Sequence, residues 1–164
     1  MKEEPCRAEQ VEQGNPLGGE VGTLGKSFAL HIPTKLLRLT EWSLEPSPLM
    51  LVAQLRAAGW IRLHLAADAH PKIEAIRLQI RQDDTPDQLE KLAVLADQYR
   101  YVKLHTANNQ RVQLDRTTTS YLGLAQKDNR AVFIEARKSA INIMSLEFRN
   151  RRLDDWRDEM SIDE

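Results

Sequence analysis

One predicted tight turn and the residue that follows it carry polar and basic side chains. Asn108, Asn109 and Gln110 form the turn, and Arg111 begins the segment that follows it. A guanidinium is a planar fork of N–H donors that can bond phosphate oxygens or a guanine edge in pairs. Lys26 lies in a loop earlier in the chain. The alternative interpretation of Arg111 is a solvated residue at the edge of a strand.

The other chemistry-bearing residues form no recognisable site. The histidines are His31, His64, His70 and His105. They have no metal-ligand spacing, so we expect no metal and no other cofactor. No serine or cysteine nucleophile lies in a known motif, and the chain has no phosphate-binding glycine loop and no distinguished carboxylate pair. We therefore expect a protein that is not an enzyme.

A basic run at 149–152, Arg-Asn-Arg-Arg, lies in the predicted last helix. It could meet phosphate. The alternative interpretation is a solvated helix face that pairs with Asp154 and Asp155.

Alternating apolar and polar residues predict the elements that position Arg111. Such period-2 alternation is typical of half-buried strands, asparagine suits the tight turn between two of them, and Gly123 suits a helix end. The predicted elements of this half are strands at 101–106, 111–114, 131–134 and 140–144, a short helix at 117–122, and a closing helix capped by Ser145.

The same order of elements is predicted earlier in the chain. Its elements are strands at 28–32, 49–55 and 60–65, a short helix at 34–39, and a helix opened by Pro71. Leu30 and Ile32 correspond to Val112 and Leu114 at an offset of 82, and residues 60–63 correspond to 140–143 at an offset of 80. We infer an internal duplication of a unit of roughly 55 residues, the alternative being two unrelated stretches of β pattern.

A further helix is predicted between the two halves. Thr85 is a helix cap and Pro86 suits the first helical position. The apolar stripe of this helix is then formed by Leu89, Leu92, Ala93, Ala96 and Tyr99. We expect this helix to bridge the two units.

Composition and charge place the chain among globular proteins. Its 164 residues are 41% hydrophobic and 29% charged, enough for one ordinary domain or two small fused units. The single cysteine, Cys6, cannot form an internal disulfide, and no apolar run is long enough to cross a bilayer, so the expected location is the cytoplasm. Net charges of −3 for 1–22, +7 for 23–153 and −5 for 154–164 suit a polyanion partner, although the acidic ends could screen it.

The order of elements and the apolar positions resemble the MraZ family, bacterial regulators of the AbrB-like swapped-hairpin class. The first unit of that family typically reads T-L-D-x-x-G-R-L-T-I-P, and residues 23–33 here read TLGKSFALHIP. The second pattern, D-x-x-G-R-I-L-L-P followed by A-G-L, falls on 107–115 and 122–124. The resemblance covers about residues 22–160 and is carried by apolar positions more than by identities.

The family's D-x-x-x-R signature, implicated in DNA binding, is only partly kept. In the first unit it has become Gly25 and Ala29, so both functional side chains are missing. In the second unit it has become Ala107 and Arg111, so the arginine alone remains. The resemblance thus implies that Arg111 contacts DNA, once in each subunit and repeatedly around an oligomer. Its candidate helpers in the same two loops are Lys26, Asn108, Asn109 and Gln110.

The resulting prediction is an α+β protein of two tandem AbrB-like units. Its boundaries are a flexible tail at 1–21, a first unit at 22–82, a second unit with the bridging helix at 83–160, and a tail at 161–164. The resemblance implies a ring-shaped homo-oligomer that binds double-stranded DNA at promoter repeats of the division and cell-wall gene cluster, in the cytoplasm and at the nucleoid. The alternative is an oligomeric interaction module of this fold that has lost DNA recognition.

Overall fold

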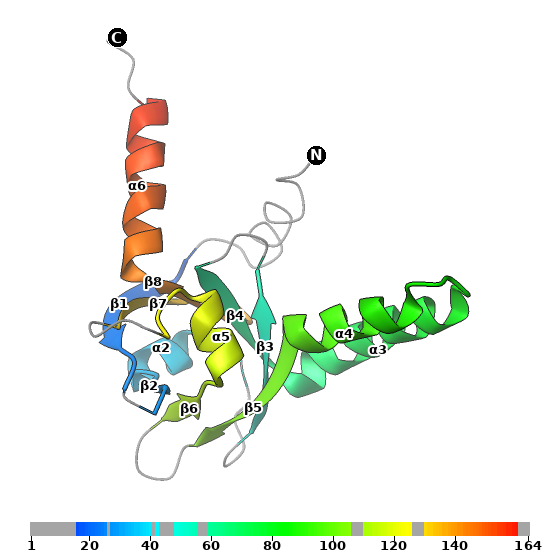
Figure 1. Ribbon diagram of the computed structural model, residues 1–164. Helices are drawn as coiled ribbons and strands as arrows, with labels where there is room; N and C mark the ends of the chain where they lie inside the picture. Colours follow the sequence, from blue (N-terminus) through cyan, green and yellow to red (C-terminus); the bar gives the residue numbers. More distant parts are fainter. Residues whose placement is uncertain are drawn as a thin grey trace.

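The protein is a mixed α/β structure built on one eight-stranded antiparallel sheet (Figure 1). The computed structural model describes residues 16–25, 27–40, 42, 48–55, 59–105, 110–125 and 130–160, without the side chains of 156 and 158–160. The strands are β1 (Gly18–Thr23), β2 (Ala29–His31), β3 (Leu49–Gln54), β4 (Trp60–Leu65), β5 (Tyr99–His105), β6 (Arg111–Gln113), β7 (Ala131–Ala136) and β8 (Ile141–Ser145). The helices are α2 (Thr34–Leu39), α3 (Ala66–Gln82), α4 (Gln88–Gln98), α5 (Arg116–Tyr121) and α6 (Leu146–Met160).

The sheet is nearly closed on itself. Its strand order is β1-β7-β8-β4-β3-β5-β6-β2, and every pair is antiparallel. The two end strands, β1 and β2, are joined by a short turn in which the Gly25 N–H donates to the Ala29 carbonyl at 2.9 Å. If β1 to β4 are exchanged for β5 to β8, the cyclic order of the strands is unchanged.

Two cross-strand residue pairs lie at the centre of this exchange of strands. Leu30 lies opposite Val112 in the β2–β6 pair, and these residues are 82 positions apart. Arg62 lies opposite Asn142 in the β4–β8 pair, 80 positions apart. Both separations equal the offsets at which the sequence pattern repeats. In each strand pair, the two residues at these equivalent sequence positions therefore lie directly opposite each other.

The core lies inside the curved sheet. The four positions predicted to be equivalent core sites, Ile32, Leu114, Ile61 and Ile141, are 0%, 2%, 0% and 0% exposed. The predicted burial is therefore confirmed, because the alternation placed these side chains on the correct face of their strands.

A smaller apolar cluster on the outer face of the sheet seats α6. Trp60 of β4 stacks on Phe148 of α6, with ring centroids 6.0 Å apart and planes inclined by 23°. Leu55 and Met144 complete the cluster. The predicted cap is confirmed, because the Phe148 N–H donates to the Ser145 hydroxyl oxygen at 3.1 Å.

Asp115 begins α5 as its N-cap. Its carboxylate accepts the Thr118 N–H at 2.7 Å and pairs with Arg100 at 2.9 Å. Partial burial acts to raise the pKa of Asp115, but the Thr118 hydrogen bonds and the Arg100 charge outweigh it and hold the pKa below its usual value. At the other end of α5, Gly123 has a φ of +80°, as its predicted role in ending the helix requires.

Three boundaries differ from the sequence prediction. Gly18–Thr23 forms β1 and pairs along its length with β7, so part of the predicted 1–21 tail is a strand. The first long helix begins at Ala66 rather than at Pro71, which lies inside α3. The bridging helix begins at Gln88, because the Gln88 side-chain amide donates to the carbonyls of residues 80, 81 and 83 and holds 83–87 as the turn between α3 and α4.

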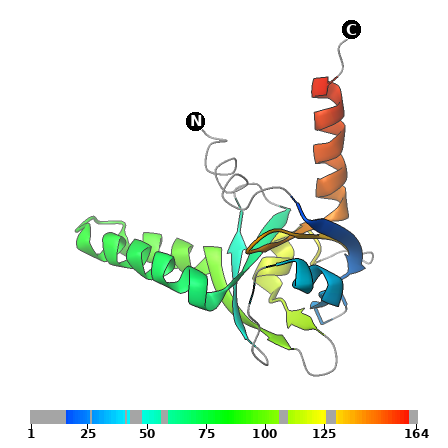
Figure 2. The ribbon, with the colours of Figure 1, turned by 180° about the vertical axis from the view of Figure 1, so that it is seen from behind.

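The α3–α4 hairpin and α6 both project from the body, in different directions in both views (Figures 1 and 2). The stripe predicted to be apolar on α4 is largely uncovered, and Leu89 is 79% exposed. No helix among the described residues is long and apolar enough to cross a membrane.

Candidate nucleic-acid interface

Three strands at one end of the sheet bring Arg111 between two histidines. In the registers of β2, β6 and β5, Arg111 lies opposite His31 on one side and opposite His105 on the other. Directly opposed residues of antiparallel strands point to the same face, and neighbouring strands are about 4.8 Å apart. His31, Arg111 and His105 therefore form one row on the outer face.

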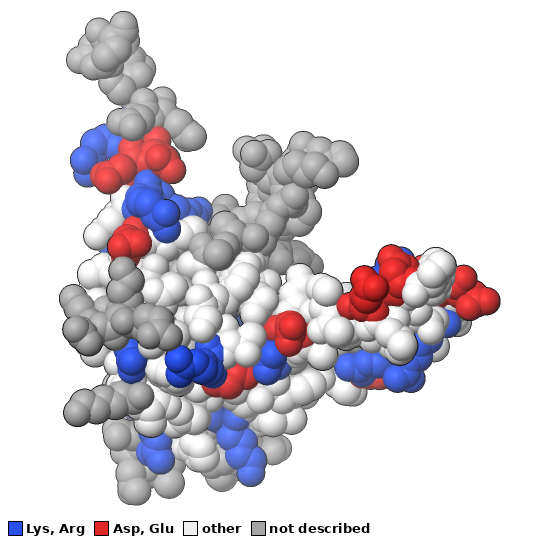
Figure 3. Space-filling view, viewed as in Figure 1, with Lys and Arg blue, Asp and Glu red and all other residues white. Residues whose placement is uncertain are grey.

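Residues two positions along the strands extend this row. Lys103 of β5 shares the face of His105, and Gln113 of β6 shares the face of Arg111, because side chains alternate between faces. We call these five residues, His31, Lys103, His105, Arg111 and Gln113, the basic face. Figure 3 shows lysine and arginine side chains over this end of the sheet.

The opposite sides of the same strands anchor the basic face in the core. Leu30, Leu104 and Val112 are all 0% exposed. No described residue of β2, β5 or β6 is acidic. The outer face thus offers cations and neutral donors to an anionic partner, held by strands that cannot shift without exposing the core.

Arg111 is the only predicted DNA-contacting residue that the structure both describes and leaves open. It is exposed and makes no ion pair with any residue in the described part of the chain. Lys26, Asn108 and Asn109, which were predicted to assist it, lie outside the described residues.

Gln110 has a structural role. Its side-chain oxygen accepts the Thr34 hydroxyl at 2.8 Å, and its carbonyl accepts the Ile32 N–H at 2.7 Å. These bonds tie the start of β6 to the end of β2 and the first turn of α2. Gln110 therefore fixes the position of Arg111 more directly than it extends the binding surface.

The turn before β2 is fixed from two sides. The Gln113 amide donates to the Ser27 carbonyl, and Arg130 donates to the Gly25 carbonyl at 3.0 Å. Phe28 has a φ of +64°, a conformation that costs a non-glycine residue free energy, and its ring lies 5.0 Å from the Arg130 guanidinium. The turn before β2 is thus held by side chains of β6 and of the segment just before β7.

Sequence reasoning missed His31, His105 and Lys103 as neighbours of Arg111. The offset of 82 contained this information. If Leu30 lies opposite Val112, 82 positions later, in an antiparallel pair, then His31 must lie opposite Arg111. The prediction did not consider that the strands predicted at 28–32 and 111–114 pair with each other.

The basic run on α6 lies elsewhere, on the outer face near β7 and β8. The Arg149 guanidinium is 3.9 Å from the Phe133 ring centroid, and that of Arg152 is 4.9 Å from Trp60. Of the two acidic partners in the alternative interpretation, Asp154 pairs instead with Arg157 at 3.6 Å.

The histidines do not gather into a metal site. No group of three or more potential ligands lies together in the part of the chain that the structure describes. His70 bonds the Tyr101 hydroxyl at 2.6 Å. Burial, together with the charges of Arg62 and Lys72, lowers the pKa of His64 to about 4, so this imidazole is neutral at pH 7.

The sequence matches no model of a known protein family, and a search of curated proteins also gives no match.

Proposed function

We propose that this chain is a DNA-binding transcriptional regulator of the MraZ type, built from two AbrB-like units and working as a homo-oligomer. The observation that carries the proposal is the position of Arg111, exposed at the centre of three strands, β2, β6 and β5, that contain no acidic residue. Its proposed targets are promoter repeats of the division and cell-wall gene cluster, and its proposed location is the cytoplasm, at the nucleoid.

The strand order supports two fused units. Exchanging the first four strands for the last four preserves the cyclic order, and the two midpoint pairs fall at the repeat offsets of the sequence. The short helices α2 and α5 follow β2 and β6, and α3 and α6 follow β4 and β8. An unrelated pair of β segments has no reason to meet all of these conditions together.

The basic face supports an electrostatic mode of DNA binding. Lys103 and Arg111 can each neutralise a phosphate and release a condensed counterion, which lowers log K by about 0.9 per phosphate for each tenfold rise in salt. One or two such contacts bind weakly. An oligomer that presents the same face several times to one duplex would multiply them through effective concentration.

The uncovered helices support self-association. Leu78, Leu89 and Val94 of the α3–α4 hairpin are 57%, 79% and 63% exposed, and Leu153 of α6 is 41% exposed. Apolar side chains gathered on projecting elements are typical of surfaces that another protein covers.

One observation favours the alternative, an interaction module that has lost DNA recognition. The position equivalent to Arg111 in the first unit is Ala29, so that half of the surface lacks its guanidinium. In this alternative the α3–α4 hairpin and α6 bind another protein, and the basic face binds no DNA.

Titration of a labelled duplex distinguishes the two functions. The full-length protein is compared with Arg111→Ala and with Arg81→Ala, a matched control that removes an exposed arginine of α3 far from the basic face. We expect binding at low salt that Arg111→Ala weakens several-fold and Arg81→Ala leaves nearly unchanged. No binding at low salt would favour the interaction module, and equal effects of the two substitutions would reduce Arg111 to background charge.

A further inference from the structure

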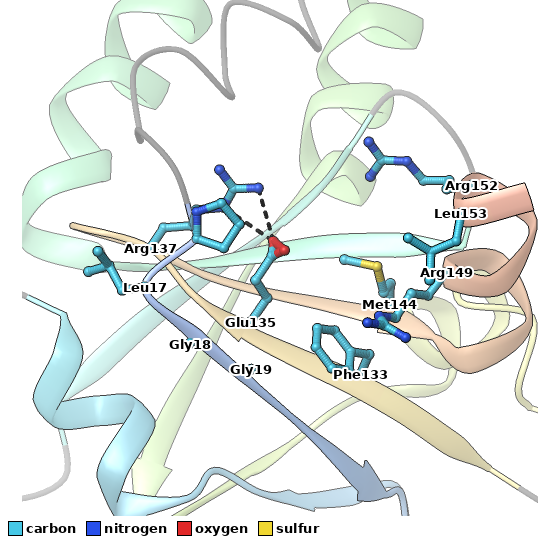
Figure 4. A pocket seen from close by; sticks show the side chains of 11 residues that line it. Leu17, Gly18, Gly19, Phe133, Glu135, Arg137, Met144, Arg149, Arg152 and Leu153 are labelled. Carbon is cyan, nitrogen blue, oxygen red and sulfur yellow. Dashed lines mark hydrogen bonds and ion pairs between the residues drawn. The ribbon is translucent and has the colours of Figure 1, made fainter. Parts of the chain in front are cut away.

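A pocket opens where α6 leaves the sheet. It has a volume of about 610 Å³. Its apolar lining comes from Leu17 before β1, Phe133 of β7, Met144 of β8 and Leu153 of α6 (Figure 4). Gly19 forms part of its wall, and a Cβ there would lie 2.3 Å from the Phe133 ring, so this wall is bare backbone. A pocket of this size and character suits one or two apolar side chains.

The charge on the pocket is unbalanced. Its titratable lining residues are Glu135, Arg137, Arg149 and Arg152, a net charge of +2. Glu135 is already paired with Arg137 at 3.0 Å. Arg149 and Arg152 make no ion pair with any described residue. Each lies against an aromatic ring, which leaves the N–H edges of its guanidinium available to carboxylates.

The complementary surface lies at the far end of the α3–α4 hairpin. Leu89 there is 79% exposed, the highest exposure among the large apolar residues of the described chain. Residues 81–91 carry Arg81 and Lys91 against Asp83, Asp84, Asp87 and Glu90, a net charge of −2. Figure 3 shows acidic side chains at the end of the hairpin and basic ones where α6 leaves the body.

Three of these carboxylates make no ion pair with any described residue, and one of the three, Asp83, accepts the Gln79 amide at 3.4 Å. Asp87 pairs with Lys91 at 3.6 Å, whereas Asp84 and Glu90 make no ion pair with any residue that the structure describes. The hairpin tip thus presents an exposed leucine with two uncompensated negative charges. The pocket presents an apolar recess with two uncompensated positive charges.

We propose that the hairpin tip of one copy docks in the α6 pocket of a neighbouring copy. Leu89 enters the recess lined by Phe133 and Met144, and the carboxylates of Asp84 and Glu90 meet Arg149 and Arg152. The contact rests on the self-association proposed above and specifies its surfaces.

The occupant must come from another molecule. The 17 residues of α3 extend about 25 Å, and they run away from α6 in both views (Figures 1 and 2). A protomer therefore cannot place its own tip in its own pocket. Because the two surfaces differ, the contact is heterologous, and repeating it closes a ring or extends a filament.

The test is a charge exchange on the full chain, followed as molar mass by light scattering at micromolar concentration. The pocket variant carries Arg149→Glu and Arg152→Glu, and the tip variant carries Asp84→Lys and Glu90→Lys. We expect each to lower the association constant at least tenfold and shift the mass toward the 18.8 kDa protomer. A chain with all four substitutions should recover assembly, since the charges are again complementary.

Controls separate this contact from general charge effects. Arg151→Glu with Arg157→Glu reverses two exposed charges on α6 outside the pocket and should leave the mass unchanged. Leu89→Glu changes an exposed position, so it tests the tip even where the pocket variant fails to fold.

If both the tip variant and Leu89→Glu keep the mass of the wild-type oligomer, the proposed contact is wrong, although the chain still self-associates. This result is expected if the pocket binds an acidic segment of a different protein. A wild-type chain that is a monomer would overturn self-association and this contact together. DNA binding is read in the separate duplex titration.

Discussion

Replacing Asn142 by alanine should destabilise the fold more than its small side chain suggests. Asn142 is 0% exposed and lies between β4 and β7. Its side-chain oxygen accepts the Arg62 Nε–H at 2.7 Å, and its amide donates to Glu135 at 3.1 Å. Each bond involves a charged group, and removing one partner of such a bond costs about 1.5–3 kcal/mol. We expect Asn142→Ala to lower the free energy of unfolding by about 3–5 kcal/mol.

Urea unfolding followed by circular dichroism measures this loss. The partner experiment replaces Arg62 by methionine and Asn142 by leucine together, which removes the buried charge along with its acceptor. Because a buried charge is costly mainly when its partner is taken away, the double variant should be more stable than the sum of the two single losses predicts, by about 1–3 kcal/mol. A loss below about 1 kcal/mol for Asn142→Ala, or strict additivity, would refute the argument.

Three further predictions concern the core, the α5 cap and pH. Ile61→Ala and Ile141→Ala should each cost about 2–5 kcal/mol in urea unfolding, and a loss below about 1 kcal/mol for either would contradict their equivalence. Asp115→Ala should lower the free energy of unfolding by about 1–2 kcal/mol because the helix cap is lost, whereas Asp115→Asn keeps the cap. The pKa of Asp115 is lowered in the folded protein, so its charge should stabilise the fold above about pH 4. The advantage of the wild type over Asp115→Asn should vanish as the pH falls below that value. The unfolded chain protonates His64 near pH 6.5 and the folded chain near pH 4, so stability should fall by up to about 3 kcal/mol as pH is lowered through this window, and His64→Gln should flatten that slope in urea titrations at several pH values.

The sequence predicted those elements whose apolar pattern reports burial directly. The alternation around Ile32, Ile61, Leu114 and Ile141 identified the core faces of four strands, since each has one side in the core. Local chemistry predicted the C-terminal end of α5 and the start of α6, because Gly123 acts through its own backbone and Ser145 through its own side chain.

Elements that depend on distant partners were missed. Gly18–Thr23 reads GGEVGT, which has neither β propensity nor alternation, and it is a strand because β7 supplies the hydrogen-bonding edge. The start of α4 was misplaced because the Gln88 amide, three residues beyond the predicted cap, binds the carbonyls at the end of α3. A sequence pattern contains no record of either contact.

The candidate site was predicted by residue type and missed in extent. Arg111 was identified from the family pattern, but its row with His31 and His105 depends on which strands pair and in which register. The α6 pocket could not be predicted either, since its lining comes from four separate segments.

The midpoint of the β2–β6 pair leads to a test in which function should be gained. About the Leu30–Val112 pair, the position equivalent to Arg111 is Ala29, which lies on the same outer face, opposite Gln113. Ala29 and Arg111 are diagonal neighbours on adjacent strands, a relation in which residues lie roughly 7–8 Å apart. Ala29→Arg would therefore place a second guanidinium beside the first, on a part of the outer face to which β2, β5 and β6 contribute no acidic residue.

If the basic face binds DNA, Ala29→Arg should tighten duplex binding at low salt several-fold. The salt dependence should steepen by about 0.9 in log–log slope for one added phosphate contact. Ala29→Gln has a comparable length without the charge and should bind like the wild type, and Ala29→Glu should bind more weakly. Equal affinities of the arginine and glutamine variants would show that DNA does not contact this face, whatever the effect of Arg111→Ala. The gain is the more decisive result, because a damaged protein can lose affinity for many reasons but has few ways to acquire it.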